Sequence, residues 1–309
     1  MSGRVAVLLA TFQGERFLDQ QLLSLATQTH RDWVLYWRDD GSSDASVAVM
    51  ERFAGCHTAG RVRQLPAPEG QIAPLASFMR LLAASLGGET DAEAFAFADQ
   101  DDVWLPEKLA RGLAALASVP AGVPALYCAR QVLVDAKLRR LGLSPPLPRA
   151  PGFPAPLAQN IATGCTIMLN RAAAAIVAHS RPPPSTLHDW WSYLLVAAAG
   201  GKLLLDDWPA VLYRQHAGNL VGAPASLVRR GLGALQRGPG AFMRGFRDHV
   251  NALAAHAELL TPQARRDLAA IQQALHGGRW RRIAALRIPG LTRRTWYETL
   301  LFRGWFLIG

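Results

Sequence analysis

The amino-acid sequence predicts an α/β protein whose mostly parallel sheet is flanked by helices. The first half alternates short apolar runs with segments of helical periodicity, which is typical of repeated strand–helix units. Three of the apolar runs lead directly into clusters of polar residues, as strands do beside a binding site. The last 85 residues lack this alternation and are rich in Ala, Leu and Arg, which predicts a C-terminal helical extension.

The elements of the first half follow from the apolar runs and their spacing. Short apolar runs predict strands at 5–10, 33–37 and 95–98, and residues 62–65 are a further candidate for a short strand. Apolar positions three and four residues apart predict intervening helices over 17–27, 45–53 and 74–86. Ser43 and Asp44 suit the cap of the second helix, and Pro106 suits the start of a helix after the fourth strand.

The second half begins with a proline-rich stretch. Six prolines between 144 and 156 predict an extended loop. A strand at 167–169 and an Ala-rich helix follow, and the helix ends before three consecutive prolines at 182–184. The remaining predicted elements are a helix over 188–199, short strands at 203–205 and 211–213, and helices from 225 onward.

Composition limits the class of protein. A chain of 309 residues that is 50% hydrophobic and 18% charged can bury a large core in one or two domains. No run of about 20 apolar residues escapes proline or charge, so no transmembrane helix is predicted. Residues 5–10 lead into a polar loop without a cleavage site, so we expect a first strand and a cytoplasmic protein. The three cysteines are far apart and are expected to be reduced thiols.

The positive charge is concentrated at one end of the chain. The formal net charge is +10, yet residues 1–224 are balanced, whereas 225–309 hold 14 arginines against four acidic side chains. This asymmetry indicates an anionic partner. Arginines with aromatic residues suit a helix on an anionic membrane surface, and solvated faces of covering helices explain them equally well. Nucleic acid is not expected, because no nucleic-acid-binding motif accompanies the charge.

An acidic cluster follows the fourth predicted strand. Asp99, Asp101 and Asp102 fall within four residues, and carboxylates this close resist ionising together. A divalent cation would relieve the repulsion, because Mg²⁺ and Mn²⁺ take oxygen ligands and bridge carboxylates to the phosphates of a substrate. The cluster alone fits equally well an acidic turn that caps the helix near Pro106.

Two further polar clusters, at 11–13 and 39–41, also follow predicted strands. The carboxyl ends of parallel strands meet at one edge of the sheet, and ligands bind there. We therefore expect the three clusters to contribute to one site.

Four ordered groups of motifs resemble those of the family 2 glycosyltransferases, which are inverting enzymes with the GT-A fold, and especially its rhamnosyltransferase-like bacterial members. The first two are Ala-Thr-Phe-Gln-Gly-Glu-Arg at 10–16 and Arg-Asp-Asp-Gly-Ser-Ser-Asp at 38–44. Asp-Gln-Asp-Asp-Val-Trp at 99–104 resembles the family's metal motif. The fourth group comprises Asn160, Gly-Cys-Thr at 164–166, His-Asp-Trp-Trp at 188–191 and Tyr-Arg-Gln-His at 213–216. The resemblance covers about residues 4–222, with Gln13 in place of the usual Asn.

This resemblance implies a GT-A catalytic domain at 1–222 and a basic, amphipathic helical segment at 223–309. The donor half of the catalytic domain would end near residue 110, and the acceptor half would cover about 111–222. Asp101 and Asp99 would hold a divalent metal, Mn²⁺ or Mg²⁺, that stabilises the departing nucleoside diphosphate. Asp189 would be the catalytic general base that removes the proton of the acceptor hydroxyl.

The resemblance also implies the remaining site residues and the substrates. The residues that bind the nucleotide sugar would be Thr11, Phe12, Glu15, Asp40, Asp99 and His216. The residues that bind the acceptor would be His188, Trp190 and Trp191. The implied donor is dTDP-rhamnose, with a UDP-sugar as the next choice. The implied acceptor is a hydroxyl of a growing, lipid-linked surface glycan, which agrees with a location on the inner face of the cytoplasmic membrane.

Two other functions stay open from the residues alone. Asp99 and Asp101 also fit the Asp-x-Asp-x-Val motif of phosphatases that use an aspartyl nucleophile. That interpretation leaves residues 4–44 and 160–191 unexplained. The non-enzymatic alternative is an inactive glycan-binding module, and the complete set of candidate metal ligands and base argues against it.

Overall fold

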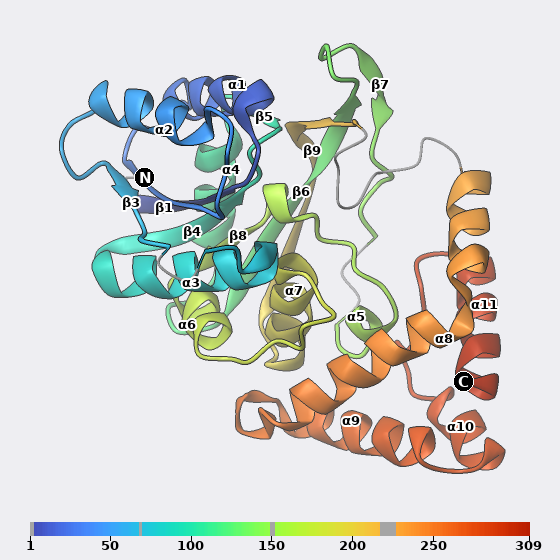
Figure 1. The fold of residues 1–309 in the computed structure, drawn as a ribbon. Coiled ribbons are helices and arrows are strands. Elements are labelled where there is room, and N and C mark those ends of the chain that lie inside the picture. Colours follow the sequence, from blue (N-terminus) through green and yellow to red (C-terminus); the bar gives the residue numbers. More distant parts are fainter. Residues whose placement is uncertain (1–2, 68–69, 149–151, 217–226) are drawn as a thin grey trace.

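A computed structural model of the chain describes residues 3–67, 70–148, 152–216 and 227–309. These residues form a curled nine-stranded sheet with helices on both faces, and a set of C-terminal helices beside it (Figure 1). The order of the strands is β3-β2-β1-β4-β8-β6-β9-β5, and β7 pairs with β6 at one side of this path. The predicted α/β class with a mostly parallel sheet and a C-terminal helical extension is confirmed.

The first half of the chain forms the parallel part of the sheet. Its strands are β1 (Arg4–Thr11), β2 (Trp33–Asp39), β3 (Val62–Gln64) and β4 (Ala92–Ala98). The intervening helices are α1 (Glu15–Ala26), α2 (Ser46–Gly55) and α3 (Ala73–Gly88). Each lies where the sequence predicts it. Alternate residues of β1 enter two cores, one under α1 and α2 and the other over α3 (Figure 1).

The second half extends the sheet with strands of mixed direction. β8 (Met168–Asn170) runs antiparallel to β4 and to β6 (Ala125–Val134), and β6 runs parallel to β9 (Lys202–Arg214). The short strands β5 (Val103–Trp104) and β7 (Arg140–Leu143) pair with β9 and β6. The helices are α4 (Lys108–Leu116), α5 (Ala155–Ala158), α6 (Arg171–Ala178) and α7 (His188–Ala198), with a 3₁₀ turn, η1, at Gly164–Thr166.

Two predictions for this half were wrong in detail, and one strand was missed. The two short strands expected at 203–205 and 211–213 are one strand, β9, whose pairing with β6 is irregular near Pro209. β6 was not predicted, because Arg130 and Gln131 interrupt its apolar residues. The proline-rich stretch is not extended throughout, since α5 begins in it at Ala155.

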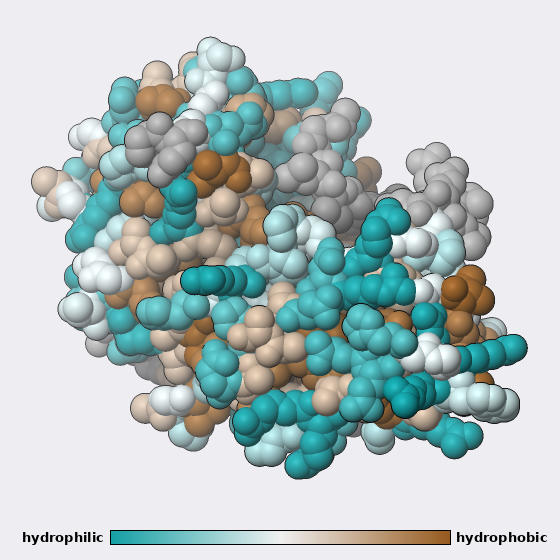
Figure 2. All heavy atoms as spheres, turned by 60° about the horizontal axis from the view of Figure 1, so that its bottom comes forward, coloured by the Kyte–Doolittle hydropathy of each residue, from teal (hydrophilic) through white to brown (hydrophobic). Residues whose placement is uncertain are grey.

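The C-terminal residues form the predicted helices. They are α8 (Leu227–Ala254), η2 (Ala257–Leu259), α9 (Pro262–Leu275), α10 (Arg279–Ala285) and α11 (Trp296–Ile308). α8 breaks at Gly238, which has φ 71° and precedes Pro239. Figure 2 shows hydrophilic side chains over much of the face that these helices present.

One hydrophobic cluster joins the sheet to the C-terminal helices. It contains Phe95 and Leu195 of the sheet and α7 together with Phe246, Phe302 and Phe306 of α8 and α11. The predicted boundary at 222 lies outside the described residues. None of the helices formed by the described residues is long and apolar enough to cross a membrane.

Candidate active site

The ends of β1 and β2 are joined by a hydrogen-bonded turn. Thr11, predicted to contact the nucleotide, is buried and donates from Oγ1 to Asp39 at 2.9 Å. Asp39 also accepts from the backbone nitrogens of Gly41 at 3.0 Å and Ser42 at 2.7 Å. Gly41 has φ 90°, which favours glycine. Asp39 therefore fixes the turn that leads to α2.

Asp40 connects β2 to the loop before α3. Its carboxylate accepts from the guanidinium of Arg38 and from the backbone nitrogens of Ile72 and Ala73, at 2.8 and 2.9 Å. Ala73 has φ 68°, a conformation that a non-glycine residue keeps only when its surroundings enforce it. Asp40 is 5% exposed, and its predicted contact with the nucleoside stays a prediction.

The loops after β1 and β4 are joined by Gln100. Its amide accepts from the Phe12 nitrogen and donates to the Phe12 oxygen, both at 2.8 Å. The Phe12 ring remains 41% exposed at the carboxyl edge of the sheet. Glu15, also predicted to bind the nucleotide, is exposed and accepts from the Ala45 nitrogen at 3.1 Å. Gln100 lies inside the acidic motif, but the sequence pattern predicts no role for this residue.

Two of the predicted donor-side residues meet after β4. Asp101 Oδ2 lies 2.8 Å from His216 Nε2, and both side chains are partly exposed. The His216 ring packs at 5.0 Å from Phe17 of α1. The carboxylate and the imidazole therefore bond each other directly.

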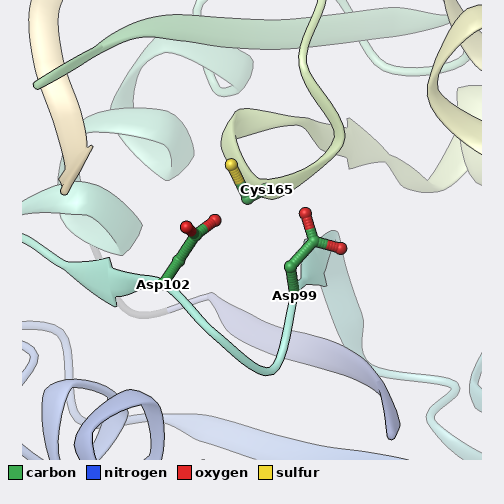
Figure 3. A group of neighbouring side chains, drawn as sticks. All are labelled: Asp99, Asp102 and Cys165. Atoms are coloured by element: carbon green, nitrogen blue, oxygen red, sulfur yellow. The ribbon is translucent and has the colours of Figure 1, made fainter. Parts of the chain in front are cut away.

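Asp99 and Asp102 lie at the two ends of the same turn. Both side chains point toward Cys165 of η1 (Figure 3), and the three possible ligand atoms lie within 4.8 Å of one another. Asp102 is fully buried and accepts from the Arg214 nitrogen at 3.0 Å, whereas its Oδ2 has no partner among the described atoms. Burial and the charges of Asp101 and Asp99 raise the pKa of Asp102.

A buried lysine completes this inner layer. Lys108 Nζ lies 3.2 Å from the centroid of the Trp104 ring, and burial lowers the pKa of Lys108 to about 7. Burial also raises the pKa of the Cys165 thiol, which stays protonated and is a poor ligand for Mg²⁺ or Mn²⁺. Asp99 and Asp101 offer the carboxylate oxygens that such an ion prefers, whereas the ligand atoms that lie within 4.8 Å of one another belong to Asp99, Asp102 and Cys165. The sequence predicts neither the burial of Lys108 nor its contact with the Trp104 ring.

The predicted general base lies on the acceptor side of this edge. Asp189 is in the first turn of α7 and is 9% exposed. Burial raises the pKa of Asp189 to about 6, against hydrogen bonds from the Trp190 nitrogen, the Asn160 side chain and the Gly164 backbone, which lower it. Burial contributes most to the raised pKa of Asp99, the charge of Asp101 comes next, and the charge of Asp189 raises it further. Asp99 and Asp189 therefore lie within electrostatic reach of each other.

The three predicted acceptor residues have different surroundings. His188 stacks on Phe78 at 3.9 Å and is 6% exposed, and burial lowers the pKa of His188 to about 3. Trp191 is fully buried and donates to the Ser180 hydroxyl at 2.7 Å. Trp190 is half-buried and donates to the Pro156 oxygen at 2.8 Å. His188 and Trp191 thus pack in the core, and Trp190 alone keeps part of its ring accessible.

The carboxyl edge of the sheet carries an acidic turn, a histidine and, on a separate helix, a further carboxylate. These groups define an α/β protein with an enzyme-like polar site. The family model of glycosyl transferase family 2 matches residues 6–174, and the chain belongs to this family. The predicted family is confirmed. Its rhamnosyltransferase-like subfamily stays a prediction. No curated protein sequence matches the chain.

Solved structures share the GT-A fold. TarS of S. aureus in complex with UDP-GlcNAc is 13% identical, with a TM-score of 0.54, and the match covers 91% of this chain and 89% of that chain. The mannosyltransferase PcManGT from Pyrobaculum calidifontis, in complex with GDP-Man and Mn²⁺, is 16% identical, with a TM-score of 0.52 over 99% of this chain and 86% of that chain.

Proposed function

We propose that this protein is an inverting glycosyltransferase that moves a sugar from a nucleoside diphosphate sugar to a hydroxyl of a glycan. The observation that carries the proposal is the meeting of two sets of groups at one edge of the sheet. On the donor side Asp101 bonds His216 and lies within electrostatic reach of Asp99, and the charge of Asp189 on α7 also reaches Asp99. Family membership supplies the transferase chemistry.

The chain's own residues account for a single displacement. Asp189 is buried, and hydrogen bonds from the Trp190 nitrogen, the Asn160 side chain and the Gly164 backbone hold its carboxylate in position. It would accept the proton of the acceptor hydroxyl as that oxygen forms a bond to the anomeric carbon. The bond from the anomeric carbon to the diphosphate oxygen breaks in the same step, and the nucleoside diphosphate leaves with its electrons. One displacement inverts the configuration at that carbon.

Asp101, Asp99 and His216 are the residues that would hold a divalent ion. When bound, Mn²⁺ or Mg²⁺ would supply positive charge that stabilises the departing diphosphate. The two solved structures named above contain UDP-GlcNAc or GDP-Man, which supports a nucleotide sugar as the donor class. We keep dTDP-rhamnose as the first candidate and a UDP-sugar as the second. A phosphatase is not favoured, because the family match over residues 6–174 includes nearly all of 4–44 and the first half of 160–191, which the phosphatase motif leaves unexplained.

Metal-dependent nucleotide binding tests this proposal directly. We expect dTDP or UDP to raise the melting temperature of the full chain by several degrees in the presence of Mn²⁺, because a ligand at 100 times its Kd stabilises by about 2.7 kcal/mol. Asp101→Asn should abolish the metal-dependent part of the shift. Asp91→Asn, an exposed change at the opposite end of β4, is the control and should keep the whole shift. No shift with any nucleotide would contradict the proposal.

The C-terminal helix α11 supports a peripheral contact with an anionic membrane. Its outward residues Trp296, Leu300 and Ile308 are 74%, 57% and 75% exposed, and Arg303 is exposed between them. These positions fall on one side of the helix. An aromatic and aliphatic face with an arginine suits the interface of anionic lipid, where a lipid-linked glycan acceptor would lie.

A further inference from the structure

A cavity of about 190 Å³ lies between the acceptor side of the sheet and the C-terminal helices. Its walls come from the proline-rich stretch, α5 and α7 on one side and from the loop between α10 and α11 on the other. The main lining residues are Pro148, Gln159, Tyr193, Thr292, Arg293 and Arg294. No step of the proposed mechanism uses this cavity.

The cavity is positively charged. Arg293 and Arg294 line it, the described lining residues include no acidic side chain, and the carboxylate of Glu298 lies within electrostatic reach of Arg293. The Arg293 guanidinium is mostly buried beside the Phe242 ring, at 5.6 Å, and its Nε has no hydrogen-bond partner among the described atoms. A buried donor without a partner is costly unless a ligand satisfies it. Arginine's fixed fork of N–H groups matches the oxygens of a phosphate or a carboxylate.

The two arginines are held in place by their backbones. The Arg294 nitrogen donates to Gln159 Oε1 at 2.7 Å, and the Arg293 nitrogen donates to Thr299 Oγ1 at 3.0 Å. The capping box of Thr295 and Glu298 starts α11 immediately afterwards. The loop therefore presents both guanidinium groups from a fixed base, which lowers the entropic cost of binding an anion.

The cavity adjoins the proposed general base by two routes. Gln159 in its wall directly precedes Asn160, whose side chain donates to Asp189. Tyr193 in its wall follows Asp189 by four residues, which is just over one turn, or about 6 Å, along the same face of α7. A group bound in the cavity thus lies within the reach of one acceptor molecule whose hydroxyl is at Asp189.

We infer that this cavity binds an anionic group, a phosphate or a carboxylate, carried by the acceptor. The inference rests on the proposed function and names the acceptor class: a glycan with a negative charge close to the hydroxyl that is glycosylated. Arg293 and Arg294 are the specificity residues. A neutral acceptor would offer these guanidinium groups no charge to pair with.

Thermal shift measurements with small anions test the inference. The full chain is saturated with UDP and Mn²⁺, so that the donor side is occupied, and glucose 1-phosphate, glucuronate or neutral glucose is then added. We expect one of the two anions, and not glucose, to stabilise the protein further. Arg294→Gln and Arg293→Gln should raise the half-saturating concentration about tenfold, as expected for the loss of one charge-assisted hydrogen bond. Arg279→Gln, at an exposed position of α10, is the matched control and should change nothing.

Each outcome decides the question. A response to glucose 1-phosphate identifies a phosphate group, and a response to glucuronate identifies a carboxylate. No response to either anion, or a response that persists in both variants or disappears in Arg279→Gln, would overturn the inference. If Arg293→Gln fails to fold, Arg294→Gln and Arg293→Lys carry the test.

The same proteins separate this inference from the proposed function. UDP binding with Mn²⁺ should be the same in wild type, Arg294→Gln and Arg279→Gln, because these residues lie away from the donor side. If UDP does not bind to wild type but the anion does, the donor assignment fails and the cavity remains a binding site. If UDP binds and no anion does, only the inference about the acceptor fails.

Discussion

Asp189 is a carboxylate whose burial and hydrogen bonds act in opposite directions. Burial has the larger effect and raises the pKa of Asp189 to about 6, whereas bonds from Trp190, Asn160 and Gly164 stabilise the ionised form. A proton acceptor works best when its pKa is near the working pH and it is still ionised. At pH 7 this side chain is mostly ionised and is a stronger base than an exposed aspartate.

This balance predicts how turnover depends on pH. With saturating Mn²⁺, kcat/KM should be level above about pH 6.5 and fall about tenfold per pH unit below about 6, because protonation removes the base. Asp189→Asn should lower kcat by about 10²- to 10⁴-fold and remove the inflection, while nucleotide binding persists. An inflection that survives in Asp189→Asn would assign the titration to another group.

Sequence motifs identify single residues of this site, but they do not show which of these residues contact one another. Asp101 and His216 are both recognisable from their motifs, yet their 2.8 Å approach depends on the pairing of β5 with β9, which no local pattern encodes. Lys108 could not be predicted as buried, because lysine is almost always at the surface. His188 and Trp191 stand in a motif, and only the structure shows that they face the core.

At the scale of elements, the carboxyl edge is built by loops that brace one another. Gln100, from the loop after β4, bonds both backbone groups of Phe12 after β1. Gly14 permits this contact, because a Cβ there would lie 2.3 Å from Gln100 Oε1. Its backbone is otherwise ordinary, with φ −99°, so close approach alone requires glycine.

Gly14→Ala should therefore weaken the site without straining the backbone. We expect a lower melting temperature and about tenfold weaker nucleotide binding, because the bond between Gln100 and Phe12 must break. Gly87→Ala in α3 has open space around its Cβ and should be neutral or stabilising by up to about 1 kcal/mol. The double change Gly14→Ala with Gln100→Ala removes the clash, so it should be no less stable than Gln100→Ala alone. Any further loss in the double variant would refute the steric explanation.

The regular alternation of strands and helices made the parallel half of the sheet predictable from the sequence. The other half lacks this alternation, so its strands were harder to locate. β1, β2 and β4 are apolar runs, and all four strands from β1 to β4 were located at the correct positions. β6 and β9 are longer, and both are only partly apolar, because they lie where the sheet changes direction and meets the polar site. A pairing between residues more than 70 positions apart leaves no local signal.

At the scale of the whole molecule, the C-terminal helices are part of one core and also offer a surface of their own. Phe302 and Phe306 of α11 are fully buried against α8. Trp296, Leu300 and Ile308 of the same helix face solvent. The sequence predicts a basic amphipathic segment, but aromatic residues fill both faces, so composition alone could not assign the inward and outward sides.

This division determines how membrane binding must be tested. Deleting α11 would remove Phe302 and Phe306 from the core, at a cost of about 3–5 kcal/mol for each large side chain, and would unfold the chain rather than test its surface. Trp296→Ser with Leu300→Ser changes only the outward face. We expect this variant to keep its melting temperature and to bind vesicles of phosphatidylcholine and phosphatidylglycerol at least tenfold more weakly, because about 1.5–3 kcal/mol of burial is lost for each side chain.

Leu23→Ser provides the matched control for this measurement. Leu23 is a comparably exposed leucine, 64% accessible, but it lies on α1 at the far side of the molecule. Its replacement should leave vesicle binding unchanged. Wild-type binding should also fall when phosphatidylglycerol is omitted or salt is raised, because the arginines near α11 contribute by charge. Equal binding by wild type and the α11 variant would mean that the outward face does not contact lipid, and the basic C-terminal segment would then act through its packing and its arginine-lined cavity.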